Sequence, residues 1–245
     1  MRLAVFSDVH ANPVALDAVL ADVDARGGAD GYWVLGDLVS PGYDPAAIPR
    51  RLAALRNVRV SRGNTDRYTL GDRYPHLSIA EAQADPSQVP RLVRIARVGA
   101  WAHGFLAATG WLDWLAALPP DLRETLPDGT RMLGVHAAPG TDDGPGIEPD
   151  AAEDEVRALL GDCGADLVLV GHTHRASDRR VCVDGAEVRV VNVGAVTGEH
   201  PTYALLEADA KGYAIGLHRT ECDMEAVSRA RRAVRYDEII RGTVG

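Results

Sequence analysis

Polar side chains with lone pairs follow five apolar runs of this sequence, each at the point where the run ends. The clearest case is DLVLVGHTHR, Asp166 to Arg175, in which four large apolar residues lead through a glycine to two histidines one residue apart. Aspartate, asparagine or histidine also follows the runs RLAVFS, GYWVLG, VRVSRG and RMLGV. Carboxylate, amide and imidazole groups bind divalent cations, and we therefore predict a metal site. Its predicted ligands are Asp8, His10, Asp37, Asn64, His136, His172 and His174.

These donors are too many for one tetrahedral ion, and they suit two ions if one carboxylate bridges them. Without thiolate ligands the set favours Mn²⁺, Fe or Zn²⁺, and Ni²⁺ and Co²⁺ also fit. Two cations about 3.5–4 Å apart form the clamp that enzymes use for displacement at phosphorus. Each motif by itself has a simpler interpretation, since Gly-Asp and Gly-Asn commonly form turns and a single histidine is usually a bonded core residue. The occurrence of all five at successive run ends favours metal binding.

The overall charge argues against a broad nucleic-acid interface. The formal net charge is −9 and the isoelectric point is near 5.3, whereas phosphate backbones are bound by clustered lysine and arginine. Two divalent cations would nevertheless outweigh the charges of Asp8, Asp37 and a bridging hydroxide. The site is therefore expected to attract a small anionic ester.

The sequence suggests a cytoplasmic protein without a membrane partner. The first apolar run is too short and too polar for a signal-peptide core, and no run approaches the ~20 apolar residues of a membrane span. The three cysteines, Cys163, Cys182 and Cys222, form no CxxC pair, so we expect free thiols rather than disulfides. Nothing in the sequence indicates the oligomeric state.

The ligand-bearing runs alternate with helix signals, which predicts a mostly parallel sheet. Asn12-Pro13 and Asp44-Pro45 each read as a helix cap followed by a first-turn proline. Strands that alternate with helices are joined by right-handed crossovers, so their carboxyl ends meet at one edge of the sheet. We therefore expect the predicted ligands to lie close together.

The remaining elements complete one predicted domain over residues 1–245. Helices are expected around Pro90–Val98 and Phe105–Leu118, inside a segment over residues 66–120 that could form a helical cap beside the site. Another helix is expected up to about Leu160, and a last one from about Asp223. Two hairpins are expected, in RVCVDGAEVRVVNVG with its Asp-Gly turn and in TYALLEADAKGYAIGLHR.

The ordered series SDVH, GD, GN, GVH and GHTH, spread over residues 8 to 174, resembles the motifs of the calcineurin-like metallophosphoesterase superfamily. This resemblance implies an α/β fold, a four-layer α-β-β-α sandwich with two mixed β-sheets and a dinuclear metal site at the carboxyl ends of the strands. It implies a bridging role for Asp37 and a metal-bridging hydroxide as the nucleophile. It assigns Asp8, His10 and His174 to one ion, and Asn64, His136 and His172 to the other.

The third motif departs from the common family pattern. Many members have histidine after GN, and that histidine helps to protonate the leaving group or to bind phosphate, whereas this chain reads RGNTD. Thr65 and Asp66 are therefore candidate catalytic residues, although a hydroxyl is a poor general acid near neutral pH. His200 or His103 could supply the proton instead. A bacterial and archaeal branch that resembles phosphodiesterases also lacks the histidine and often carries Asn-Pro-Gly-Ser, of which VVNVGAV, with Asn192 and Gly194, is a loose version.

The second motif departs as well, because GDLVSPG lacks the arginine that follows GD in phosphoprotein phosphatases and symmetrical dinucleoside tetraphosphatases. Arg62, Arg67 and Arg175 flank the predicted ligands and are candidates for substrate binding, although each could equally be solvated or paired with an acidic residue. His76 and His218 are expected to be surface or structural residues.

We therefore expect a two-metal phosphoesterase that hydrolyses small phosphodiesters, cyclic nucleotides being one example. A phosphomonoesterase or dinucleoside polyphosphatase is the alternative enzyme, and a non-catalytic metal-binding scaffold is the alternative of a different class. The complete set of ligand residues favours an enzyme over a scaffold.

Overall fold

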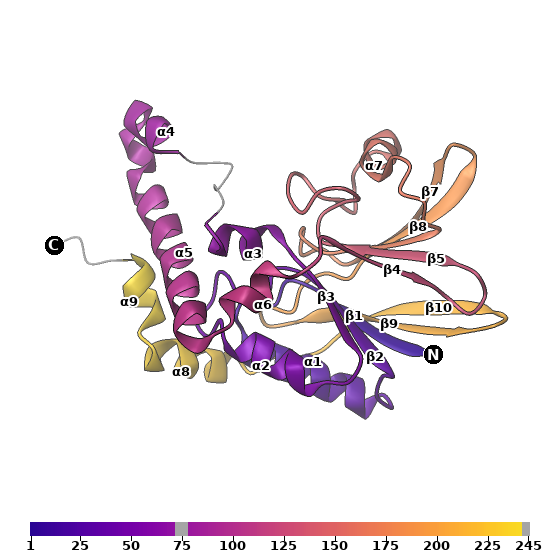
Figure 1. Cartoon of the computed structure of the whole chain (residues 1–245), viewed down its shortest axis with the longest axis horizontal. Helices are drawn as coiled ribbons and strands as arrows, with labels where there is room; N and C mark the ends of the chain where they lie inside the picture. The colour runs from indigo at the N-terminus through magenta and orange to yellow at the C-terminus, as the bar shows by residue number, and fades with distance from the viewer. Residues whose placement is uncertain (72–77, 242–245) are drawn as a thin grey trace.

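Two five-stranded sheets form the centre of the computed structural model, which describes residues 1–71 and 78–241 (Figure 1). The first sheet has the order β10-β9-β1-β2-β3 and the second β4-β5-β6-β8-β7. In each sheet three neighbouring strands are parallel, β1, β2 and β3 in the first and β5, β6 and β8 in the second, while the other strands pair antiparallel. The strands are β1 Arg2–Phe6, β2 Gly31–Leu35, β3 Val58–Ser61, β4 Asp121–Thr125, β5 Arg131–Val135, β6 Leu167–Val170, β7 Ser177–Val183, β8 Ala186–Asn192, β9 Thr202–Asp209 and β10 Gly212–Arg219.

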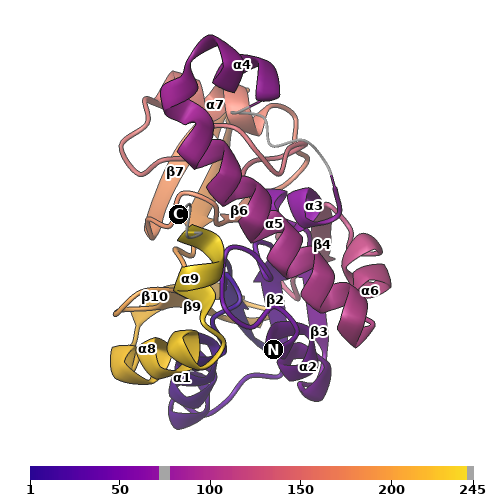
Figure 2. The same ribbon diagram turned by 90° about the vertical axis from the view of Figure 1, so that its left-hand side faces the viewer.

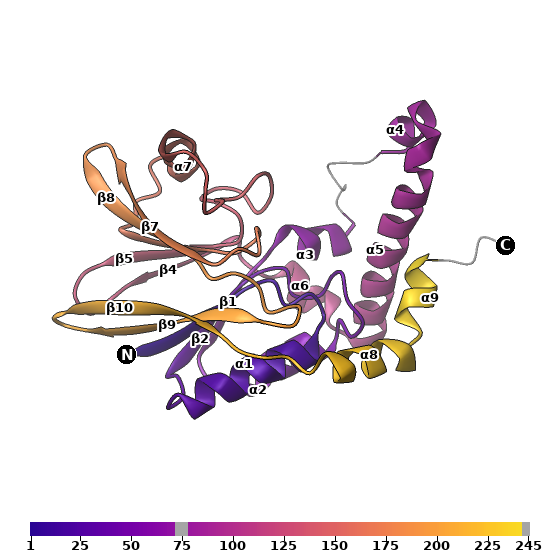
Figure 3. The ribbon, with the colours of Figure 1, turned by 180° about the vertical axis from the view of Figure 1, so that it is seen from behind.

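Helices cover the outer faces of both sheets. The helices α1 and α2 lie below the first sheet and α7 lies above the second, as the front and rear views show (Figures 1 and 3). The long helix α5 crosses the end of the molecule toward which β1, β2 and β3 run (Figure 2). The helices are α1 Pro13–Ala25, α2 Ala47–Ala54, α3 Asn64–Thr69, α4 Ile79–Ala84, α5 Val89–Thr109, α6 Leu112–Ala116, α7 Glu153–Leu160, α8 Met224–Ala233 and α9 Tyr236–Arg241.

Alternation of side chains along fully buried strands builds three apolar layers. In β1, Leu3 and Val5 belong to the core between the two sheets, whereas Phe6 belongs to the core beneath the helices of the first sheet. In β6, Leu167 contributes to the inter-sheet core and Val168 to the core beneath α7. Because successive side chains of a strand point to opposite faces, a continuous apolar run needs cover on both sides. The resulting layers confirm the expected α-β-β-α sandwich.

Both predicted hairpins and the predicted helix starts are present. The strands β7 and β8 pair across the turn at Asp184, and β9 pairs with β10. Asn12 caps α1, with its side-chain oxygen accepting from the amide of Ala15 at 3.2 Å. The helix α2 begins at Ala47, later than the Asp44-Pro45 signal suggested, but Asp44 still accepts a hydrogen bond from the Ala47 amide at 3.1 Å.

The segment between residues 66 and 120 differs from its prediction. The two helices expected around Pro90–Val98 and Phe105–Leu118 are in fact one long helix, α5, and a short one, α6, separated by the left-handed Gly110. The interior glycines of α5 did not end it, because its buried side chains Val98, Ala102 and Leu106 offset their cost of about 1 kcal/mol each. The short elements α3, α4 and β4 were not predicted. No helix of the described residues combines the length and the apolar character that a membrane crossing requires.

Candidate metal centre

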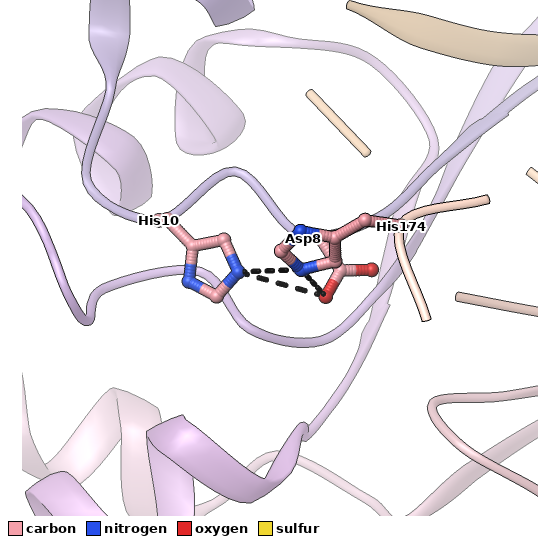
Figure 4. Close-up of side chains that lie close together, drawn as sticks. All are labelled: Asp8, His10 and His174. Atoms are coloured by element: carbon pink, nitrogen blue, oxygen red, sulfur yellow. Dashed lines mark hydrogen bonds and ion pairs between the residues drawn. The ribbon is translucent and has the colours of Figure 1, made fainter. Parts of the chain in front are cut away.

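The first group of donors consists of Asp8, His10 and His174, which lie after β1 and β6 (Figure 4). His174 Nε2 lies 3.1 Å from Asp8 Oδ1 and 3.0 Å from His10 Nε2. The Asp8 carboxylate is fully buried, whereas the His174 side chain is 41% exposed. The group is therefore anchored in the core and opens toward solvent at His174.

The second group contains Asn64, His136 and His172. His136 Nε2 is 3.0 Å from Asn64 Oδ1 and 3.2 Å from His172 Nδ1. His136 is fully buried at the end of β5, and Asn64 is the first residue of α3. The structure therefore brings together the residues that were assigned to the second ion.

Asp37, after β2, stands between the two groups. Its Oδ1 lies 3.3 Å from His136 Nε2, and its Oδ2 lies 3.9 Å from His10 Nε2. Asp8 instead uses Oδ2 to accept a hydrogen bond from the backbone amide of His172 at 2.9 Å. Asp37 is therefore placed with one oxygen toward each group, as a bridging ligand requires.

Backbone carbonyls orient three of the four imidazoles. His10 Nδ1 lies 2.6 Å from the Ser40 carbonyl oxygen, His136 Nδ1 lies 2.7 Å from that of Leu35, and His172 Nε2 lies 2.9 Å from that of Gly144. A carbonyl oxygen can only accept, so these ring nitrogens carry the hydrogen when the rings are neutral. The opposite nitrogen of each ring then presents its lone pair to the centre.

The inward-facing nitrogens of these histidines are consequently hydrogen-bond acceptors, and they lie next to one another and to carboxylate and amide oxygens, which are also acceptors. Such lone pairs repel one another unless a proton or a cation lies between them. Donor atoms that bind one cation at about 2.0–2.2 Å and at a right angle lie about 3 Å apart, close to the spacings found here. The donor set therefore fits divalent cations, held by imidazole and oxygen ligands without thiolate.

The electrostatics of the two aspartates and His136 also favour bound positive charge. Burial opposes ionisation of Asp8, but the charge of His136 and the hydrogen bond from His174 outweigh it and lower the pKa of Asp8. Burial likewise opposes ionisation of Asp37, but His136 keeps the pKa of Asp37 well below its usual range. Burial opposes protonation of His136, yet the charges of Asp37 and then Asp8 raise its pKa to about 10. The two buried carboxylates therefore favour a positive charge at the centre.

The two candidate catalytic residues after Asn64 make contacts that support neighbouring loops. Thr65 donates its hydroxyl hydrogen to the Ser40 carbonyl at 2.7 Å, the same oxygen that orients His10. Asp66 is fully buried and accepts hydrogen bonds from the amides of Leu38 and Gly63 at 2.9 and 3.0 Å. Burial, and then the charge of Asp37, raise the pKa of Asp66 to about 7. Catalytic roles for Thr65 and Asp66 stay predictions, and their contacts are those of structural supports.

The two histidines considered as alternative proton donors contact groups outside the metal centre. His103 Nδ1 lies 2.9 Å from the Thr69 carbonyl, which joins α5 to α3. His200 Nε2 lies 3.9 Å from Glu199 Oε2 on the surface. Among the described residues, neither histidine has a recorded contact with a predicted ligand, so donation by either stays a prediction.

The three arginines proposed for substrate binding are paired with carboxylates. Arg67 donates to both carboxylate oxygens of Asp142, through Nη2 to Oδ1 at 2.8 Å and through Nε to Oδ2 at 3.0 Å. Arg62 lies 3.7 Å from Asp142, and Arg175 lies 3.0 Å from Asp150. These contacts agree with the interpretation that the three arginines are paired with acidic residues.

Asn192 supports the histidine pair after β6. Its buried amide donates to the Gly171 carbonyl at 2.9 Å and to Thr173 Oγ1 at 3.0 Å, so it holds the GHTH turn. His218 lies beside the ring of Tyr203, as expected of a structural residue, and His76 lies outside the described residues. All three cysteines are free.

The groups that orient the ligands could not be predicted from the sequence. The carbonyls of Ser40, Leu35 and Gly144 carry no signal in the sequence, because every residue has a carbonyl. Asp142 and Asp143 were also missed. Asp143 contacts Arg67 and the Tyr68 hydroxyl, so it fixes the loop after β5 to α3.

Comparison with known proteins places this arrangement in a family. Residues 1–211 match the family model of the calcineurin-like phosphoesterase superfamily domain. No curated protein matches the chain significantly.

Two solved structures resemble the chain over nearly its full length, and at these identities they show the fold alone. A hypothetical protein from Pyrococcus horikoshii OT3 is 20% identical with a TM-score of 0.75, covering 98% of this chain and 96% of its own. A metallophosphoesterase from Sphaerobacter thermophilus is 24% identical with a TM-score of 0.69, covering 98% and 97%. The family match over most of the chain, together with the ordered donors, shows that this protein belongs to the calcineurin-like phosphoesterase superfamily.

Proposed function

We propose that this protein hydrolyses small phosphodiesters with the help of two divalent cations. The observation that carries the proposal is the convergence of inward-facing acceptors from both sheets on one region. Asp8, His10 and His174 would hold one cation, Asn64, His136 and His172 the other, and Asp37 would bridge. When bound, the cations would supply Lewis acidity toward the phosphoryl oxygens and would lower the pKa of a water molecule, which would then serve as the expected nucleophile. Mn²⁺, Fe and Zn²⁺ suit these ligands best.

Diesters are preferred to monoesters on two grounds. A monoester carries up to two negative charges on the reacting phosphoryl group, whereas a diester carries one. The arginines beside the ligands are neutralised by Asp142, Asp143 and Asp150, so they offer little extra positive charge to a dianion. The chain also lacks an imidazole at position 65, and Thr65 already donates its hydrogen to Ser40. Weak acid assistance suits esters with good leaving groups.

The test compares bis(p-nitrophenyl) phosphate with p-nitrophenyl phosphate, which share a leaving group. The protein is loaded separately with Mn²⁺, Fe²⁺ and Zn²⁺, and kcat/KM is measured for each ester. We expect the diester to be hydrolysed at least tenfold more efficiently. A higher kcat/KM for the monoester would identify the protein as a phosphomonoesterase and contradict the proposal. If neither ester is hydrolysed with any of the metals, the result would support a non-catalytic metal-binding scaffold.

A further inference from the structure

A pocket of about 300 Å³ lies between the loop after β2 and the helix α5. Its described lining consists of Pro41, Arg91, Arg94, Ile95 and Val98, and it includes no carboxylate. Arg91 and Arg94 are three residues apart, so they lie on one face of α5. The pocket therefore combines two guanidinium groups with an apolar wall.

These two arginines differ from most arginines of this acidic protein. In the described part of the chain neither has a recorded hydrogen bond or ion pair, whereas Arg62 and Arg175 are paired with carboxylates. Arg97, one turn further along α5, donates to the Ile239 carbonyl at 3.5 Å. Two adjacent guanidinium groups without counter-ions repel each other, and an anion placed between them would relieve that repulsion.

The pocket is joined to the metal centre by two short connections. Pro41 directly follows Ser40, whose carbonyl orients His10, and the His10 side chain remains 11% exposed. The helix α5 packs against α3, which begins with Asn64, and the His103–Thr69 hydrogen bond joins the two helices. The pocket therefore adjoins the loop that orients His10, and its helix packs against the helix that begins with Asn64.

We propose that this pocket binds a second anionic group of the substrate, such as a phosphate attached to the part of the ester that does not react. The aliphatic or ring portion between the two anions would contact Ile95, Val98 and Pro41. This proposal rests on the proposed phosphodiesterase function and narrows its substrates to diesters with a further phosphate. It assigns Arg91 and Arg94 the recognition role that sequence analysis gave to Arg62, Arg67 and Arg175.

The test uses a matched pair of substrates, thymidine 5′-(p-nitrophenyl phosphate) with and without a 3′-phosphate. Both have the same leaving group and the same scissile diester, so only the distal anion differs. We expect KM to be about tenfold lower for the 3′-phosphorylated ester, and we expect this advantage to shrink as salt screens the exposed arginines. In the Arg91→Gln/Arg94→Gln variant the two substrates should have equal KM values.

Arg56→Gln is the matched control, because Arg56 precedes β3 and so lies at the strand end opposite the centre. It should keep the tenfold ratio. The proposed role of the pocket would be rejected if the two substrates had equal KM values in the unmodified protein. It would also be rejected if the double variant kept the tenfold ratio of KM values. Neither result would contradict the proposed phosphodiesterase function.

A calorimetric measurement separates the two proposals if no ester is hydrolysed. Thymidine 3′,5′-bisphosphate is titrated into the unmodified protein and into the double variant, with thymidine 5′-monophosphate as the reference ligand. Tighter binding of the bisphosphate to the unmodified protein alone supports the pocket. Equal binding of the two nucleotides rejects it.

Discussion

Backbone strain is concentrated on the residues that converge at the metal centre. Of the nine non-glycine residues with positive φ in the described part of the chain, five are predicted ligands, namely Asp8, His10, Asp37, His172 and His174. Left-handed backbone at such residues costs on the order of 1–3 kcal/mol each and persists only where the surroundings enforce it. Here hydrogen bonds between the ligand loops enforce it, such as that from the His10 amide to the Asp37 carbonyl at 2.9 Å. The strained backbone lowers the folding stability, and it directs these side chains toward the metal centre.

Removal of the central carboxylate is expected to cost both cations. Asp37→Ala removes one carboxylate oxygen from each of the two groups of donors, so metal content should fall from two cations per chain to less than one. Metal analysis of the purified variant after equilibration with Mn²⁺ measures the change. Asp17→Ala removes an exposed carboxylate on α1 and should keep both cations. Retention of two cations by Asp37→Ala would contradict the bridging role.

Metal binding is expected to tighten as the pH rises. A pKa of about 10 would keep a proton on the His136 ring near neutral pH, and a cation must displace that proton; against the effect of burial, the hydrogen bond and charge of Asp8 raise the pKa of His174 as well. Raising the pH lowers the cost of that displacement, so Mn²⁺ affinity should increase between pH 6 and pH 8 with net proton release. Calorimetric titrations in buffers of different ionisation enthalpy measure the released protons. Affinity that is constant over this range would show that the rings are not protonated without metal.

At the scale of elements, the donors meet because loops after strands of different sheets approach each other very closely. Gly171, between β6 and His172, is packed against Ser7 and Asp8 after β1. A Cβ atom at Gly171 would lie 2.5 Å from Asp8 Oδ2 and closer still to Ser7 Oγ. The apolar runs with polar ends were visible in the sequence, but this contact between sheets was not, because a glycine in GHTH also reads as an ordinary turn residue.

Gly171→Ala should therefore weaken metal binding and lower stability, although Gly171 is not itself a predicted ligand. The added methyl group must push apart the loops that carry Asp8 and His172, which costs about 1–3 kcal/mol and weakens metal binding. Urea unfolding and Mn²⁺ titration measure the two effects. Gly104→Ala provides the matched control, because its Cβ position in α5 is open and alanine favours helix, so this variant should be stabilised by about 1 kcal/mol. Unchanged metal affinity in Gly171→Ala would mean that the loops can separate freely.

Other elements show where local sequence patterns are too weak to decide. The strand β4 could have been inferred from Asp128-Gly129, which lies between it and β5, but its exposed side chains lack the apolar character of the other strands. In α5, burial of Val98, Ala102 and Leu106 stabilises one continuous helix where two were expected. Tertiary packing therefore decided these boundaries.

At the scale of the whole molecule, the predicted ligands join the two sheets. Asp8, Asp37 and Asn64 follow strands of the first sheet, whereas His136, His172 and His174 follow strands of the second. Bound cations would therefore act as cross-links across the inter-sheet core that contains Trp33 and Met132.

Chelation is expected to destabilise the protein as a whole. Each cation at about 100 times its dissociation constant stabilises the folded state by about 2.7 kcal/mol, which corresponds to a rise in Tm of roughly 5–10 °C per filled site for a chain of this size. Differential scanning calorimetry with excess Mn²⁺ and with EDTA measures the shift. The same comparison with Asp37→Ala should give a much smaller shift. An equal shift in both proteins would show that the metal effect arises elsewhere.

The sequence by itself determined which donors would gather at the edge of each sheet, because the carboxyl ends of parallel strands in one sheet share one edge. Asp8, Asp37 and Asn64 follow such strands of the first sheet, and His136 and the GHTH pair follow those of the second. Only the tertiary structure brought the two edges together, because the packing of one sheet on the other carries no local signal. The sandwich followed from the resemblance of the ordered motifs to the calcineurin-like superfamily, whereas the alternation of apolar runs and helix signals predicted only a mostly parallel sheet. Only the tertiary structure decided which nitrogen of His10, His136 and His172 faces inward, since the orienting carbonyls come from residues distant in the chain. It likewise decided that Arg62 and Arg175 are neutralised while Arg91 and Arg94 are not, because ion pairing depends on distances that side-chain identity does not encode.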